Sequence, residues 1–204
     1  MGGKASIAGN LYDKYNSRNP VVRLMMKGFL DSLLRLVEPL DIKNVLEVGC
    51  GEGRLTHFIK ASKPGVSIEG SDLSREIIEA ALREYIGIKF SVQDVEALDY
   101  PDGSVDLVVA CEVLEHLRRP EDALVEIKRV TREYALFSVP REPLWSILNM
   151  ARGKYIKSKG NTPGHLQRWS RGDFIKLLSR HFRVLKCLTP LPWTMVLCRK
   201  ETGV

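Results

Sequence analysis

After residue 41 the chain alternates short apolar runs with amphipathic segments, and this alternation limits the possible folds more than any other feature. The apolar runs are Asn44–Val48, Val66–Gly70, Lys89–Val92, Val105–Ala110 and Tyr134–Val139. Apolar residues at helical spacing separate most of them, over Arg54–Ser62, Ser74–Tyr85 and Glu121–Val130. Strands that alternate with helices in this way form a parallel sheet with helices on both faces. The pattern therefore predicts an α/β fold.

Both ends of the chain depart from this alternation. From Pro20 to about Leu40, after a small and polar tail, apolar residues recur at helical spacing. Near the C-terminus Arg183–Thr189 and Trp193–Arg199 are β-like and flank a Pro-Leu-Pro turn, which predicts an antiparallel hairpin at the sheet edge. The result is a seven-stranded, mostly parallel sheet in one domain spanning residues 1–204, with residues 1–40 as tail and first helix. Residues 141–168 fit neither strand nor connecting helix, and we interpret them as a lid-like insertion.

The composition limits the partners and the compartment. The net charge of +6 is compatible with nucleic acid, anionic lipid or an acidic metabolite as partner, and equally with none of them. The four cysteines form no CxxC pair, and no apolar run approaches the roughly 20 residues that a membrane-spanning helix requires. Reduced thiols and the lack of a signal peptide lead us to expect a cytoplasmic protein.

A glycine-rich turn follows the first apolar run and precedes the first helical segment behind it. It contains Gly49, Cys50, Gly51 and Gly53. Glycines let the backbone approach a ligand closely, and the N-terminus of the next helix favours negative groups. The spacing departs from the G-x-G-x-x-G dinucleotide fingerprint, because the third glycine comes one residue early and Arg54 takes its place. The turn predicts a cofactor site of another kind.

Acidic residues accompany the first three predicted strands. Glu47 lies just inside the first strand, Asp72 follows the second and Asp94 follows the third. Open α/β sheets bind ligands at the carboxyl ends of their strands, so these side chains should converge on one crevice. Asp72 comes about 20 residues after the turn, where a carboxylate can accept hydrogen bonds from both ribose hydroxyls. Asp94 is placed to accept from an adenine amino group.

Three segments in order along the chain resemble a known family. Val45–Gly53 is similar to the first motif of the class I S-adenosylmethionine-dependent methyltransferases, Gly70–Leu73 to their acidic loop, and Asp106–Leu117 to their fourth-strand motif. The likeness runs from about Leu11 to Arg199 and favours the branch with the ubiquinone- and menaquinone-pathway methyltransferases. It implies a Rossmann-like fold, with S-adenosylmethionine as cofactor and S-adenosylhomocysteine as product.

The resemblance also implies roles for the cofactor-side residues. Gly49 and Gly51, with Cys50 between them, would lie against the methionine part, and Glu47 would act through its amino group or a water. Asp72 would hold the ribose. The other contacts would come from Leu73 against adenine, Asp94 and Val95 at the adenine edge, the backbone of Cys111 at the methionine ammonium, and Tyr15 over the cofactor. Tyr12 and Arg18 are alternatives to Tyr15, and simple packing of the first helix is the competing interpretation for each.

The acceptor side has its own candidates. Transfer to an oxygen needs an aligned nucleophile and removal of its proton. His116, the neighbouring Glu115 and the distal His165 are the candidate catalytic residues. With Glu112 they resemble the Glu-x-x-Glu-His plus distal His of small-RNA 2′-O-methyltransferases, where a divalent metal would hold the acceptor oxygens. The alternative is that Glu115 and His116 only orient substrate and cap the helix, so we assign no metal ligand.

The acceptor itself stays open. We expect a small-molecule or lipid-like acceptor, methylated at oxygen; RNA or protein methylation and a non-catalytic cofactor-binding relative are the alternatives. A nicotinamide-dependent reductase is disfavoured by the G-x-G-x-G spacing, by Asp94 and by the lack of a Tyr-x-x-x-Lys pair.

The insertion allows two interpretations. Within residues 143–159 a set of apolar residues shares one helical side, and three lysines follow: Leu144, Ile147, Leu148 and Ala151, then Lys154, Lys157 and Lys159. The segment is either a lid whose apolar side packs over the active site, or a lid that also contacts a membrane or lipid substrate, since Trp, apolar residues and Lys together suit an interface.

Overall fold

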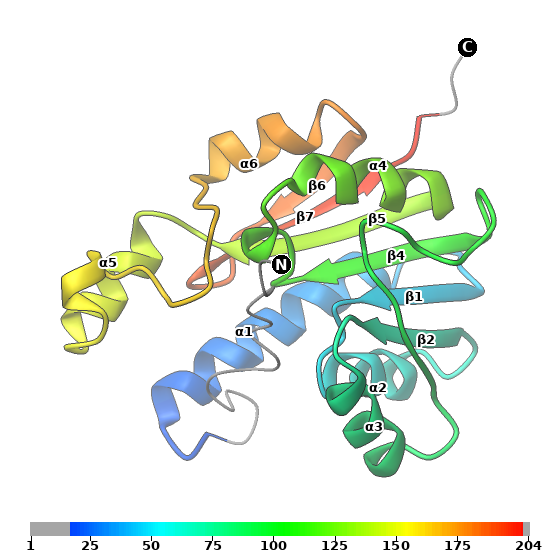
Figure 1. Ribbon diagram of the computed structural model, residues 1–204, viewed down its shortest axis with the longest axis horizontal. Coiled ribbons are helices and arrows are strands. Elements are labelled where there is room, and N and C mark those ends of the chain that lie inside the picture. The colour runs from blue at the N-terminus through cyan, green and yellow to red at the C-terminus, as the bar shows by residue number, and fades with distance from the viewer. Residues whose placement is uncertain (1–16, 202–204) are drawn as a thin grey trace, which may run out of the picture.

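A seven-stranded sheet forms the centre of the computed structural model, which describes residues 17–201 (Figure 1). The strand order is β3-β2-β1-β4-β5-β7-β6. The strands are β1 (Asn44–Val48), β2 (Ser67–Asp72), β3 (Lys89–Val92), β4 (Val105–Cys111), β5 (Thr131–Pro140), β6 (Arg183–Leu188) and β7 (Trp193–Arg199). All pairings among β1 to β5 are parallel, whereas β7 pairs antiparallel with both β5 and β6. The predicted α/β fold with its C-terminal antiparallel hairpin is confirmed.

Helices cover both faces of this sheet, as the alternation predicted. The helices are α1 (Pro20–Val37), α2 (Arg54–Ser62), α3 (Arg75–Glu84), α4 (Pro120–Val130), α5 (Leu144–Ala151) and α6 (Arg171–Leu178). Apolar residues of α1 and α2 form one core layer with the residues of β1 and β4 that point toward them, such as Val45 and Leu107. Residues of α4 and α6 form the other layer with Leu46 and Val108, which point to the opposite face.

Local sequence explains where several helices begin. The Asn19 side chain accepts the backbone N–H of Val21 at 2.9 Å, and Pro20 occupies the first turn of α1, where its missing N–H leaves no bond unmade. Ser74 and Ser170 cap α3 and α6 in the same way. The first helix ends at Val37, slightly before the expected Leu40. The fifth strand begins at Thr131 rather than Tyr134, because α4 runs directly into it.

Residues 141–168 leave the carboxyl end of β5 and project beyond the sheet, so that α5 stands apart from the other helices in Figure 1. They contain α5 and a short 3-10 turn, η2 (Ile156–Ser158). A β-bridge between Arg141 and Trp169 joins the two ends of the segment. Because β5 is parallel to β1 and β4, the segment rises from the sheet edge at which those strands end.

Among residues 17–201 no helix combines the length and the apolar character needed to cross a bilayer.

Candidate active site

The glycine-rich turn leaves β1 in a conformation that ordinary residues rarely adopt. Gly49, Gly51 and Gly53 all have positive φ, at 66°, 54° and 79°. A Cβ at Gly49 would also overlap the Val113 side chain, which follows β4. Gly53 then starts α2. The turn therefore needs glycine for both backbone conformation and space, and it presents main chain at the carboxyl end of β1.

Asp72, the last residue of β2, fastens this turn. Its Oδ2 accepts the backbone N–H of Gly51 at 3.0 Å, and its Oδ1 accepts that of Ser74 at 3.0 Å. The side chain is half-buried. Leu73, next in sequence, is 55% exposed and leaves an apolar surface beside the carboxylate.

Glu47 is a buried acid within β1. It is 3% exposed, and its Oε2 accepts a hydrogen bond from the Thr56 hydroxyl of α2. Burial raises the pKa of Glu47 to about 8, and the negative charge of Asp72 acts in the same direction, whereas the Thr56 hydrogen bond opposes the rise. A carboxyl in this state suits a position that a cationic group will approach.

The other cofactor-side candidates also lie at carboxyl ends of strands. Asp94 follows β3, and its Oδ1 accepts the backbone N–H of Glu96 at 3.0 Å. Val95 is half-buried against the core layer of α4 and α6. Cys50 is buried in the turn, and Cys111 is the buried last residue of β4. Tyr12 and Tyr15 lie outside the described residues, while Arg18 is exposed just before α1.

The chain does not continue helically after β4 in the way that the Glu112, Glu115 and His116 grouping required. Glu112 has a left-handed backbone, with φ 62°, and only a 3-10 turn, η1 (Leu114–His116), follows it. The Glu112 carboxylate accepts a hydrogen bond from the Trp193 indole at 2.8 Å. Glu112 is therefore not part of the group in which the resemblance placed it with Glu115 and His116, because its left-handed backbone precedes the turn and its carboxylate bonds to Trp193.

Glu115, His116 and His165 do come together. One ligand-capable atom from each lies within 4.8 Å of those of the other two. The imidazole rings of His116 and His165 are 5.0 Å apart, edge to face. Glu115 is 1% exposed, whereas His116 is exposed. A buried acid and two imidazoles thus form one cluster, named here the 115/116/165 cluster.

Backbone hydrogen bonds bring the distal histidine to this position. The Glu115 carbonyl accepts the N–H groups of Leu166, at 2.8 Å, and Gln167, at 3.0 Å. Nδ1 of His116 lies 3.0 Å from the carbonyl oxygen of Gly164. A carbonyl can only accept, so Nδ1 carries the proton and Nε2 of neutral His116 keeps its lone pair.

Two tryptophans that the sequence analysis did not assign to the site lie near the cluster, Trp145 in contact with His165 and Trp193 in contact with Trp145. The Trp145 ring stacks on His165 at 6.1 Å between centroids and donates its indole N–H to the Thr162 hydroxyl at 2.9 Å. Trp193 lies 6.1 Å from Trp145 and 5.0 Å from Phe29 of α1. Trp193 pairs with Pro140, at the carboxyl end of β5. The sequence pattern predicted a hairpin at the sheet edge but did not indicate which of its two strands pairs with β5. Trp193 lies near the cluster because that strand is β7.

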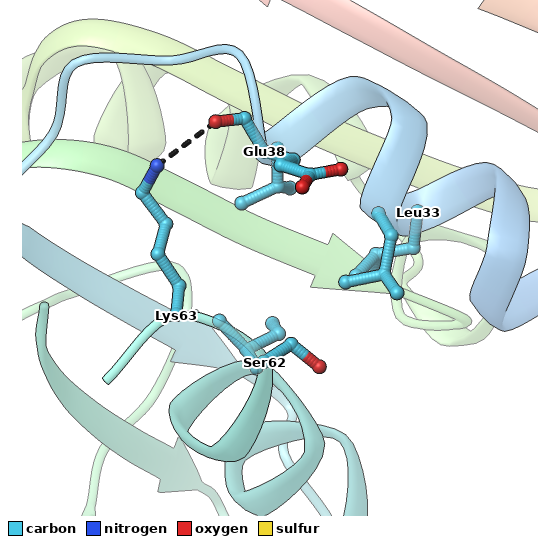
Figure 2. A pocket seen from close by; sticks show the side chains of 7 residues that line it. Leu33, Glu38, Ser62 and Lys63 are labelled. Carbon is cyan, nitrogen blue, oxygen red and sulfur yellow. Dashed lines mark hydrogen bonds between the residues drawn. The ribbon is translucent and has the colours of Figure 1, made fainter. Parts of the chain in front are cut away.

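A separate small cavity, of about 80 Å³, lies between the C-terminal ends of α1 and α2 (Figure 2). Lys63 crosses it to donate to the Glu38 carbonyl at 3.0 Å. Because α2 runs back from the carboxyl end of β1, this cavity lies at the opposite edge of the sheet from Asp72 and the 115/116/165 cluster. It is a packing gap between helices and contributes nothing to the candidate site.

The fold and the site together define a class. An open parallel sheet, with a glycine-rich turn after β1 and acids on β1, β2 and after β3, is the architecture of an α/β protein that binds a nucleotide-containing cofactor at the carboxyl ends of its strands. The family model described as "Methyltransferase domain" matches residues 46–139, which run from β1 through β5. Residues 46–139 are therefore a methyltransferase domain of the class I, S-adenosylmethionine-dependent kind, whose cofactor is S-adenosylmethionine.

Named relatives agree with this assignment. The chain is 34% identical over 110 residues to a malonyl-[acyl-carrier protein] O-methyltransferase of Hahella chejuensis, covering 53% of this chain and 39% of that protein. It is 26% identical over 166 residues to a ubiquinone biosynthesis O-methyltransferase of Coxiella burnetii, covering 71% and 69%. For three of the relatives the match spans only 35% to 39% of their own length.

Among solved structures, magnesium protoporphyrin IX methyltransferase of Synechocystis, with bound S-adenosylhomocysteine, is similar with a TM-score of 0.67 and 19% identity. The similarity covers 91% of this chain and 89% of that one. At this identity the likeness shows a shared fold.

Proposed function

We propose that this chain transfers a methyl group from S-adenosylmethionine to an oxygen atom of a small-molecule or lipid-like acceptor. The observation that carries the proposal is the 115/116/165 cluster, which stands at the same sheet edge as Gly49, Gly51 and Asp72. A cofactor side and a proton-accepting side thus meet at the ends of neighbouring strands. The two O-methyltransferases among the relatives support oxygen as the acceptor atom.

On the cofactor side the turn and the acids divide the work. The main chain at Gly49 and Gly51 would contact the methionine part of the cofactor, and the Glu47 carboxylate would pair with its ammonium group. The Asp72 carboxylate is held by two N–H groups, and its remaining lone pairs would accept from the ribose hydroxyls. Leu73 offers an apolar surface for adenine, and Asp94 with Val95 would contact its edge, while the Cys111 carbonyl would receive the ammonium.

On the acceptor side His116 would take the proton. The cofactor supplies an activated sulfonium methyl group whose bond to sulfur breaks as the new bond to oxygen forms. Nε2 of His116 has the free lone pair, so it accepts the proton of the acceptor hydroxyl during this step. The buried Glu115 beside it would stabilise the imidazolium that results. His165 and the stacked Trp145 would form the wall against which the acceptor aligns.

A metal-assisted form of the same reaction is the second candidate, and the close approach of three ligand-capable atoms within 4.8 Å favours it. One carboxylate and two imidazoles fit Mn²⁺ or Zn²⁺ better than Mg²⁺. A bound ion would lower the pKa of an acceptor hydroxyl. Glu115, His116 and His165 would hold it, and Glu112 would take no part.

Radiolabelled cofactor separates these possibilities. The purified chain is incubated with S-adenosylmethionine labelled in the methyl group and with separated lipid, small-metabolite, RNA and protein fractions of a cell extract. Label in a lipid or small-metabolite product, lost with His116→Ala, supports the proposal. Label only in RNA or protein, or in no fraction, contradicts it.

Chelation tests the metal. If an ion takes part, EDTA abolishes transfer, Mn²⁺ restores it, and binding of S-adenosylhomocysteine stays unchanged. Full activity in EDTA leaves His116 as the base without a metal.

A further inference from the structure

We propose that the outer side of residues 141–168 is an attachment surface for an anionic lipid bilayer. The outer side is defined by Leu144, Ile147, Leu148 and Ala151 of α5, together with Ile156 of η2. The inference goes beyond methyl transfer and does not depend on it, because it concerns a surface that neither the cofactor residues nor the 115/116/165 cluster occupy.

The first observation is that α5 is turned inside out. Its buried residues are Ser146 and Asn149, whereas Ile147 is 51% exposed and Ala151 is exposed. Leu144 and Leu148 are half-buried. Of the two interpretations of this segment, packing of the whole apolar side over the active site does not account for Ile147 and Ala151. A helix on the surface of a globular protein normally turns its polar side to the solvent, and α5 does the opposite.

The polar side is held inward by specific bonds. The Ser146 hydroxyl donates to Glu142 at 2.8 Å and lies 2.9 Å from the Arg168 guanidinium, which donates to it. The Asn149 amide donates to the Gly160 carbonyl at 2.9 Å. A Cβ at Gly160 would overlap the backbone of Ser146, so loop and helix are in close contact. The helix cannot rotate its apolar side inward without breaking these bonds, so the exposure of Ile147 follows from the way the segment is built.

The neighbouring loop also presents an apolar residue outward. Tyr155 and Lys159, on either side of η2, have left-handed backbones, with φ of 56° and 51°. The Gly160 N–H closes the loop onto the Tyr155 carbonyl at 2.8 Å. Ile156 stands at the tip and is 64% exposed. Two non-glycine residues in left-handed conformations and a backbone hydrogen bond thus keep Ile156 exposed to solvent. Ile156 is the second exposed isoleucine of the segment, after Ile147.

Charge decides which partner fits this surface. Residues 143–160 contain four basic residues and no acidic one, in a chain whose net charge is +6. All four, Arg152, Lys154, Lys157 and Lys159, are exposed. Exposed aliphatic side chains with basic ones close to them in the same segment match a bilayer surface, where acyl chains contact the former and anionic headgroups the latter. RNA would pair with the basic side chains but would leave Ile147 and Ile156 exposed to solvent. A second copy of this surface would carry the same positive charge and would be repelled.

The position of the surface makes the attachment useful. The segment leaves the carboxyl end of β5 (Figure 1). It also carries Trp145 and His165, whose rings stack on each other beside the candidate active site. A bilayer bound there would lie next to the mouth of the candidate active site.

Sedimentation with vesicles tests the proposal. Vesicles of phosphatidylcholine alone and of phosphatidylcholine with phosphatidylglycerol are mixed with the whole chain at low and high salt. We expect binding to the anionic vesicles that falls at high salt, because the lysine contribution is screened. Ile147→Ser with Ile156→Ser should weaken it about tenfold, since the apolar burial is lost. Lys157→Gln with Lys159→Gln should also weaken it about tenfold.

Matched variants elsewhere serve as controls. Leu82→Ser with Val125→Ser removes comparably exposed apolar residues from α3 and α4, and Lys176→Gln with Lys186→Gln removes lysines from α6 and β6. These should bind as the unmodified chain does, and a thermal shift with S-adenosylhomocysteine checks that every variant is folded.

Three results would overturn the proposal. One is equal recovery with neutral and anionic vesicles. Another is loss of binding with the lysine variant but not with the isoleucine variant, which indicates a polyanion site. The third is self-association without vesicles that the isoleucine variant abolishes, which indicates that a second copy covers the surface. Sedimentation needs neither cofactor nor acceptor, so its failure would leave methyl transfer untouched.

Discussion

Asp72 has two tasks, since its carboxylate closes the glycine-rich turn and faces the proposed ribose position. Asp72→Ala leaves buried hydroxyls unpaired, so we expect a loss of about 1–3 kcal/mol of binding, or ten- to a hundredfold in affinity for S-adenosylhomocysteine. Isothermal calorimetry measures it. Glu79→Ala, an exposed acid on the neighbouring α3, should bind normally. Unchanged affinity in Asp72→Ala would remove the ribose assignment.

Glu47 gives the cofactor-free protein a pH-dependent stability. Its pKa is about 8 in the folded chain against 4.5 in the unfolded one, because burial disfavours the charged form. The folded state therefore binds the proton more tightly, and the stability from this group is complete below pH 4.5 and lost as the pH rises through 8.

Urea unfolding at several pH values measures this effect. Between about pH 5 and pH 8 the free energy of unfolding should fall more for the unmodified chain than for Glu47→Gln, whose side chain cannot ionise. Parallel curves for the two proteins would show that Glu47 ionises as freely when folded as when unfolded.

At the scale of elements, residues 141–168 act as a single unit whose inner bonds position His165. Gly160→Ala would push the loop away from Ser146, since a Cβ has no room there. We expect at least a tenfold loss of methyl transfer with unchanged affinity for S-adenosylhomocysteine, because a misplaced acceptor wall disturbs alignment only. The matched control is Gly153→Ala, which shares a positive φ but has open space around it. Equal effects of both substitutions would attribute the loss to backbone strain and not to the contact with Ser146.

The sequence pattern predicted the positions of the strands but not the orientation of α5. Periodicity found every strand of the sheet to within a few residues, because a short run rich in apolar residues is a local feature of the sequence. The same periodicity found one apolar side on α5 but left open whether it packs over the active site or also contacts a membrane. The spacing of apolar residues shows that a helix has an apolar and a polar side. Which side faces the protein depends here on Glu142, Arg168 and Gly160, whose hydrogen bonds hold the polar side of α5 inward.

For the molecule as a whole, ligand binding should appear as added thermal stability. S-adenosylhomocysteine at about a hundred times its dissociation constant adds about 2.7 kcal/mol, which raises Tm by about 5–10 °C for a chain of this size. NADH should give no shift, since the turn lacks the dinucleotide spacing. Differential scanning fluorimetry with both ligands measures it. A shift with NADH alone would contradict the cofactor assignment.

The sequence by itself determined the fold class, the methyltransferase domain and the order along the chain of the candidate cofactor residues. These depend on features within a few residues of one another, such as glycines directly after a strand and an acid at the next strand end, and parallel strands bring such features to one edge without further information. The specific role of each residue stays a prediction, as does the limit of the domain.

Only the tertiary structure decided the acceptor side. It brought His165 to Glu115 and His116, about 50 residues earlier in the chain, through backbone hydrogen bonds of the Glu115 carbonyl. It showed that Glu112 has a left-handed backbone and bonds to Trp193 of the last strand, apart from this cluster. Each of these depends on contacts between distant segments, whose geometry follows from how the layers pack and not from the local order of residues.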